Sequence, residues 1–127
     1  MALVAGVATG TGAGESKTFA LMGQKDSPKA SGTATVEGTK LTVTATGLRP
    51  NGVYTVWLVN MQPNMTKAGA GTPPYAFKAD ARGNARYTAD LNESPMGKWQ
   101  VIFIVRHPSG DPKAMDQMED ALMAKLM

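Results

Sequence analysis

Cysteine is absent from this 127-residue chain, and histidine occurs once, as His107. Without cysteine the chain cannot form disulfides, thiolate metal centres or a thiol nucleophile. A single histidine is too few for a three-histidine zinc site, and no Gly-x-Ser-x-Gly segment offers the serine of a hydrolase elbow. We therefore expect a protein that is not an enzyme and that holds no cofactor, apart from the copper alternative below.

Clustered charge and long apolar runs are scarce as well. The 13 Lys and Arg residues stand against 10 Asp and Glu residues, which leaves a formal net charge of +3, and no basic run exceeds two residues. Proteins that bind nucleic acids usually concentrate basic residues on one face, so we expect no nucleic-acid partner. The apolar run from Ala2 to Ala8 is too short to cross a bilayer, so we expect no stable membrane span.

Residues 1–16 differ in composition from the rest of the chain, because positions 1–14 carry no charge and are almost all small or apolar. This stretch resembles the end of a signal peptide, although the basic segment that normally precedes the apolar run is missing. The alternative is a disordered Gly-Ala tail. We favour export, and expect a periplasmic or extracellular protein with one folded domain over residues 17–127.

Alternation of apolar and polar residues is the main structural signal. Over Lys40–Thr46 the apolar positions alternate with threonines, which predicts a strand with one buried face. Residues 53–59 and 99–106 are apolar on both faces, which predicts two central strands that lie side by side or across the core from each other. Trp57 and Trp99 belong to these strands, so we expect both rings to fill the core. Further strands are predicted over residues 18–22, 32–37, 75–79 and 85–89, the last two as a hairpin around a turn at 80–84.

Two segments lie outside this strand pattern. Residues 60–74 form the longest irregular stretch, which predicts either a binding loop or a crossover between two sheets. Residues 112–126 follow a capping residue, Asp111, and carry apolar side chains at spacings of three and four: Met115, Met118, Leu122 and Leu126. This spacing predicts a C-terminal helix. The fold expected from all these elements is an all-β, immunoglobulin-like antiparallel sandwich of about seven strands with a C-terminal helix.

Methionine is unusually frequent, with nine in the chain. Thioether sulfur is a soft ligand for Cu(I), so His107 with Met61 and Met65 of the long loop could form a copper site if the loop and the predicted helix share one end of the sandwich. The alternatives for His107 are a hydrogen bond to a backbone carbonyl at the sheet edge, exposure with titration near pH 6.5, or an acid–base role with Asp111.

Two segments carry a resemblance to a known family. Residues 42–59 hold a strand, a Gly-Leu-x-Pro turn and a Tyr-x-x-Trp-Leu-Val strand, and residues 77–85 hold an Asp-x-x-Gly turn. Over roughly residues 33–105 the chain is similar to small exported bacterial β-sandwich domains, in particular the extracytoplasmic C-terminal domain of anti-sigma-K factors. The resemblance implies a fold and an interaction role, with no catalytic residues to transfer. We recognise no sigma-binding segment in the given residues before position 33, so we do not expect anti-sigma activity.

These observations predict a non-enzymatic, exported β-sandwich that acts as an interaction or binding module for a protein or cell-surface partner. The alternative is a periplasmic protein that binds Cu(I) or a small ligand through His107, Met61 and Met65.

Overall fold

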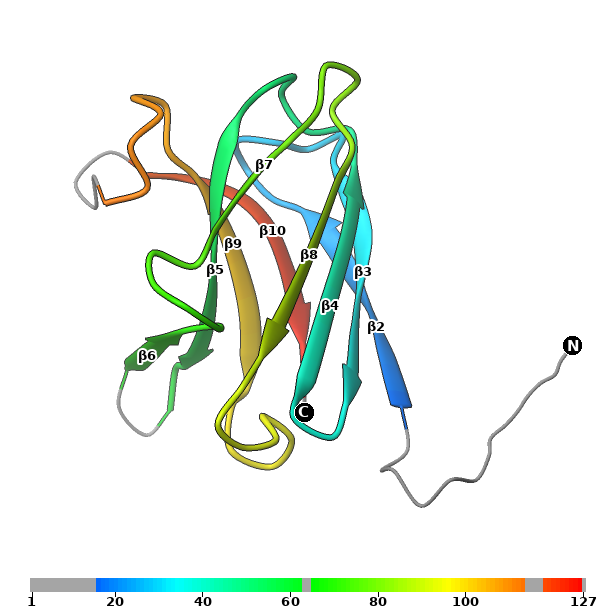
Figure 1. The fold of residues 1–127 in the computed structure, drawn as a ribbon, viewed down its shortest axis with the longest axis vertical. Coiled ribbons are helices and arrows are strands. Elements are labelled where there is room, and N and C mark those ends of the chain that lie inside the picture. Colours follow the sequence, from blue (N-terminus) through cyan, green and yellow to red (C-terminus); the bar gives the residue numbers. More distant parts are fainter. Residues whose placement is uncertain (1–15, 63–64, 114–117, 127) are drawn as a thin grey trace, which may run out of the picture.

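The structure is a computed structural model that describes residues 16–62, 65–113 and 118–126. These residues form nine strands and no helix, and every strand pair is antiparallel (Figure 1). In chain order the strands are β2 (Ser16–Gly23), β3 (Ser31–Glu37), β4 (Lys40–Thr46), β5 (Val53–Asn60), β6 (Thr66–Gly69), β7 (Ala76–Lys78), β8 (Ala85–Asp90), β9 (Val101–Arg106) and β10 (Glu119–Lys125). No helix within the described ranges has the length and apolarity that a bilayer span requires. The predicted leader falls almost entirely on residues 1–15, which lie outside the described residues.

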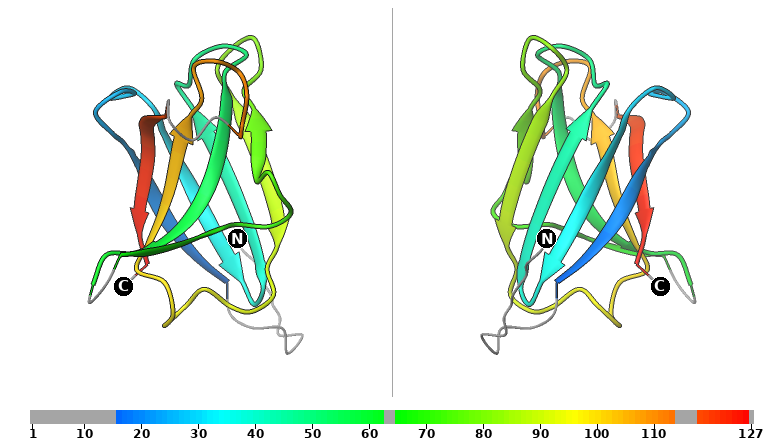
Figure 2. Two further views of the ribbon diagram at one scale, coloured as in Figure 1. Left: turned by 90° about the vertical axis from the view of Figure 1, so that its left-hand side faces the viewer. Right: turned by 90° about the vertical axis from the view of Figure 1, so that its right-hand side faces the viewer.

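The strands belong to one sheet with the order β6-β5-β9-β10-β2-β3-β4-β8, and β7 pairs with β5 beside β6. The sheet is curled, so that β4 and β8 lie across from β5 and β9 in the views of Figures 1 and 2. The all-β, antiparallel class predicted from the sequence is confirmed. The two central strands predicted over residues 53–59 and 99–106 lie side by side, because β5 pairs with β9 along its length.

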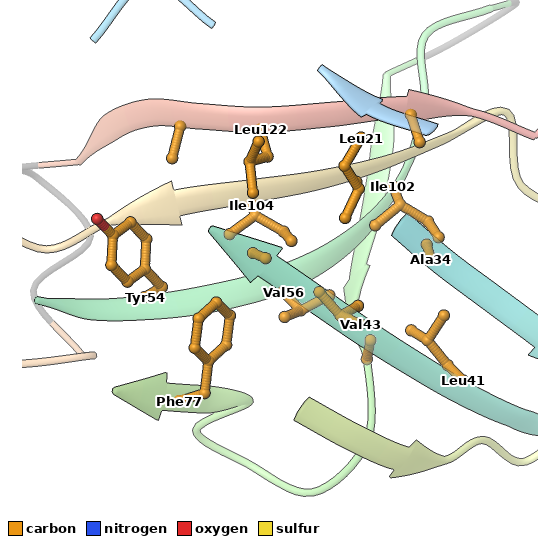
Figure 3. Packing of buried hydrophobic residues seen from close by; sticks show 14 of the residues in the cluster. Leu21, Ala34, Leu41, Val43, Tyr54, Val56, Phe77, Ile102, Ile104 and Leu122 are labelled. Carbon is orange, nitrogen blue, oxygen red and sulfur yellow. The ribbon is translucent and has the colours of Figure 1, made fainter. Parts of the chain in front are cut away.

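The hydrophobic core fills the inside of the curl. Leu21, Val56, Ile102, Ile104 and Leu122 are almost fully buried, and their side chains point toward one another from β2, β5, β9 and β10 (Figure 3). The strand register explains this arrangement, because Val56 pairs with Ile104 and Ile104 with Leu122. Paired residues of neighbouring strands direct their side chains to the same face of a sheet.

One hydrogen bond ties the two ends of the curled sheet together. The Tyr87 hydroxyl of β8 donates to the backbone carbonyl of Ala70, which follows β6, over 2.6 Å. The Tyr87 ring also packs against Phe77 of β7, with 5.9 Å between ring centroids. Burial, with a smaller contribution from nearby Tyr75, raises the pKa of the Tyr87 phenol. The hydroxyl therefore stays protonated at neutral pH and remains a donor.

The predicted C-terminal helix over residues 112–126 is wrong. Residues 119–125 form β10, which pairs with β9 on one side and with β2 on the other. Leu122 and Leu126 share one face in a helix, but an even spacing also places them on one face of a strand. Asp111 does not cap a helix: its Oδ1 accepts a hydrogen bond from the Lys113 N–H within a turn. Met115 lies outside the described residues.

Two connections also differ from the prediction. The stretch 60–74 contains β6, a short edge strand that pairs with β5. The predicted hairpin over residues 75–89 is wrong, because β7 pairs with β5 whereas β8 pairs with β4. The turn between them is present: Asp80 Oδ1 accepts hydrogen bonds from the N–H groups of Asn84 and Arg82, and these two bonds lower the pKa of Asp80.

Substitution of Ala124 tests the strand assignment of β10. Ala124 is buried inside the curl, whereas a helix would place it opposite Leu122 and Leu126, on the polar face. We expect Ala124→Glu to lower the free energy of unfolding by about 3 kcal/mol or more, because it buries an unpaired charge. Urea denaturation measures the change.

The matched control is Lys125→Glu, because Lys125 is the exposed neighbour on the outer face of the same strand. We expect this variant to change the free energy of unfolding by less than about 1 kcal/mol. Equal stability of the two variants would contradict the strand and favour the helix.

Candidate functional site

The outer face of β5 carries the candidate site. Thr55 and Trp57 are two positions apart and point away from the core, toward the same side as Val105 and Phe103 of β9. Thr55 is fully buried on this face, and Trp57 is half-buried. The prediction that Trp57 fills the core is therefore wrong, whereas the Trp99 ring does pack against the core cluster.

A chain of hydrogen bonds fixes the Trp57 side chain from behind. The indole Nε1–H donates to Thr55 Oγ1 over 2.8 Å, and the same oxygen lies 2.8 Å from His107 Nε2. Indole is only a donor, so the Thr55 oxygen must accept that bond, and it has a proton and a second lone pair left for the imidazole. Thr55 therefore links Trp57 to His107 whichever partner donates in the second bond.

His107, which is hydrogen-bonded to Thr55, is buried and not exposed at the surface. Its side chain is 1% exposed, and its backbone N–H extends the β5–β9 ladder by donating to the Val53 carbonyl over 2.8 Å. The prediction of an exposed histidine is wrong. The ring Nε2 bonds to the Thr55 hydroxyl, and Asp111 Oδ1 accepts a bond from the Lys113 N–H in its own turn. The predicted bond from His107 to a backbone carbonyl stays a prediction.

The segment between β6 and β7 leaves the sheet after Ala70 and returns at Tyr75, and both of these residues bond to the backbone of Val56. The Ala70 N–H donates to the Val56 carbonyl, and the Val56 N–H donates to the Tyr75 carbonyl, each over 3.0 Å. Both ends of this excursion are thus fixed on β5. The prolines Pro73 and Pro74 lie within it, beside Trp57.

Tyr75 is held against Trp57 in a strained backbone conformation. Its φ of 65° lies in the left-handed region, which is unfavourable for a bulky residue and is often found at functional sites. The ring makes an edge contact with Trp57, with 5.3 Å between centroids. It lies over Gly69 so closely that a Cβ there would be 2.0 Å from Tyr75 Cε2. Only glycine leaves room for the ring at this position.

These side chains border an open groove of about 400 Å³, which we call the Trp57 groove. Its lining residues are Trp57, Pro73, Pro74, Tyr75, Pro112 and Lys113. The lining is mainly apolar. The Lys67 ammonium lies 5.6 Å from the centroid of the Trp57 ring, within the range of a cation–π contact. The groove therefore combines a fixed aromatic surface with two positive charges near it.

The three predicted copper ligands do not lie together in the structure. The Met61 N–H bonds to Gln100, which precedes β9, whereas His107 follows the other end of β9. A strand rises about 3.3 Å per residue, so Met61 and His107 are roughly 20 Å apart. Met65 precedes β6 near the Met61 end, and both methionines are exposed, at 44% and 70%. Whether the chain binds Cu(I) by another route stays a prediction.

No group of three His, Cys, Asp or Glu side chains that could hold a metal ion occurs among the described residues. The groove residues that the sequence analysis missed are Tyr75, Pro112 and Lys113. The run Thr72-Pro73-Pro74-Tyr75 could have identified part of the groove, because its two prolines have no N–H for the hydrogen bonds of a strand ladder.

Replacing Thr55 by valine tests the hydrogen-bond chain. Valine has nearly the same shape, but it leaves the Trp57 N–H and His107 Nε2 facing a methyl group. We expect Thr55→Val to lower the free energy of unfolding by about 2 kcal/mol, because buried polar groups lose their partner. Thr44→Val, on the exposed outer face of β4, is the matched control and should change it by less than about 0.5 kcal/mol. Equal losses in urea denaturation would show that the hydroxyl of Thr55 has no special role.

A double-mutant cycle tests the packing of Tyr75 on Gly69. The added methyl of Gly69→Ala must displace the ring, so we expect a loss of about 1–3 kcal/mol and a changed Trp57 environment in fluorescence and NMR. In a Tyr75→Ala background the same glycine substitution should cost almost nothing, because the clash is removed. An unchanged cost in that background would show that Gly69 is required for another reason.

Comparison with known proteins adds no relative. No family model, no curated protein and no solved structure matches the chain. The similarity to anti-sigma-K domains thus stays a prediction from sequence motifs.

Proposed function

We propose that the protein is a non-enzymatic binding module whose Trp57 groove receives part of a protein partner. The observation that carries the proposal is the fixed orientation of the Trp57 ring. Thr55 accepts a bond from its N–H, Tyr75 packs against it with an edge-type ring geometry, and the Lys67 ammonium lies over its face. A ring that is already ordered loses little conformational entropy when a ligand binds, which favours affinity.

The composition of the groove supports binding rather than chemistry. Aromatic side chains in a partly exposed, apolar setting are typical of recognition surfaces. The titratable residue nearest to Trp57 in the hydrogen-bond chain, His107, is buried behind Thr55 and does not line the groove. The proposal therefore assigns His107 a positioning role.

We also propose the finer fold and setting that the sequence suggests. The curled sheet would correspond to an immunoglobulin-like sandwich of the type found in exported bacterial domains, and the module would act in the periplasm or at the cell surface. The support is the antiparallel order of the strands around one core and the leader-like composition of residues 1–14.

A fragment titration followed by NMR tests the binding site without assuming the ligand. We use a set of small aromatic and alicyclic carboxylates with their neutral amides, and record the backbone and indole N–H resonances. We expect the largest shifts at Trp57 and Tyr75, because these rings are the accessible apolar surface of the groove.

The Trp57→Ala variant should lose these shifts, whereas Met22→Ala should keep them. Met22 is the matched control, because it is 62% exposed and lies in β2, outside the groove. Fragments that shift other regions only, or shifts that survive Trp57→Ala, would contradict the proposed site.

A further inference from the structure

The lining residues of the Trp57 groove offer a ligand no free backbone N–H. The lining prolines have no backbone N–H. The Tyr75 N–H donates to the Thr72 carbonyl over 2.8 Å, and the Lys113 N–H donates to Asp111 Oδ1 over 2.9 Å. Trp57 lies in a strand that is paired on both sides, and its indole N–H bonds to Thr55. The side-chain donors of the lining are therefore the Tyr75 hydroxyl and the Lys113 ammonium.

This shortage restricts the backbone conformation of an occupant. An added β-strand needs main-chain partners along a sheet edge, and a sugar needs several polar side chains, so neither suits this lining. A polyproline II segment needs neither, because its backbone makes no internal hydrogen bonds and stays solvated while proline removes the N–H. Its pyrrolidine rings pack well on aromatic faces, and the open groove leaves the outer side of such a segment in water.

The charge at the groove sets a second requirement. Lys67 lies over Trp57, and Lys113 belongs to the lining. Within the described ranges the ion pairs join Lys98 to Glu93 and Arg106 to Glu119, so neither Lys113 of the lining nor Lys67 beside Trp57 is paired with a described carboxylate. A complementary ligand carries negative charge beside its apolar residues.

We infer that the occupant of the Trp57 groove is a proline-rich segment of a partner protein with acidic residues flanking the prolines. This inference rests on the proposed function and names the chemistry of the partner. Proline rings contact Trp57 and Tyr75, and flanking carboxylates face Lys67 and Lys113.

Peptide titrations test the inference. The probe is an end-capped peptide, Glu-Pro-Pro-Leu-Pro-Pro-Glu, and binding is followed at the indole N–H of Trp57 by NMR. One comparison peptide has alanine in place of every proline, and a second has lysine in place of both glutamates. We expect each to bind at least about tenfold more weakly, the first because it is not preorganised and the second because it is repelled.

Substitution of Lys67 and Lys113 tests the same charge interaction from the side of the protein. Lys67→Gln with Lys113→Gln should reduce affinity for the acidic peptide by about tenfold and weaken its salt dependence. Lys125→Gln, on the outer face of β10 and outside the groove, should leave both unchanged. These variants alter exposed side chains, so the test does not depend on a substitution of Trp57.

The outcomes separate the two proposals. If fragments bind at Trp57 but the acidic proline peptide does not bind better than its comparison peptides, the ligand class is wrong and the binding site stands. If neither fragments nor peptides reach Trp57, the proposed function fails as well. Binding to phosphatidylglycerol vesicles that competes with the peptide and needs both lysines would overturn the protein partner in favour of an anionic membrane surface.

Discussion

The pairing of β5 with β9 is the constraint on which the rest of the structure depends. Its register places Val56 opposite Ile104 on the inside of the curl. The same register places Trp57 opposite Phe103 on the outside and brings the His107 N–H to Val53. A shift by one residue would exchange the two faces and expose the core residues. One set of backbone hydrogen bonds therefore determines both the core and the candidate site.

Both faces of β5 are partly covered, and the reasons differ. The inner face packs against the core cluster, as any central strand of a curled sheet must. The outer face is bordered near Trp57 by irregular segments, which contribute Pro73, Pro74 and Pro112 to the lining of the groove. Irregular segments leave gaps that strands do not, and a groove forms between them. The apolar outer face of β5 is thus largely shielded from water, while the groove leaves part of Trp57 accessible to a ligand.

Alternation in the sequence was sufficient to predict the strands that have a buried and an exposed face, such as β4. Apolar residues on both faces were sufficient to identify β5 and β9 as central strands. These patterns were not sufficient for β10, because Leu122 and Leu126 fit a helix and a strand equally well locally. The space between β9 and β2, which only the complete sheet creates, decides for the strand. For the site, His107 was singled out, but its role depends on Thr55, and nothing in the local sequence shows that these residues 52 positions apart meet. For the same reason the sequence could not show that Met61 and His107 lie near opposite ends of β9, since local patterns do not determine strand direction.

The central claim is that the Trp57 ring is fixed in place before any ligand binds. The most direct measurement is hydrogen exchange of the two indole N–H groups, followed by NMR in the free protein. The Trp57 N–H bonds to the fully buried Thr55, whereas no described residue accepts a bond from the Trp99 N–H. We predict that the Trp57 N–H exchanges much more slowly than that of Trp99 and becomes fast in Thr55→Val. Equal exchange rates of the two indoles in the unaltered protein would contradict the account.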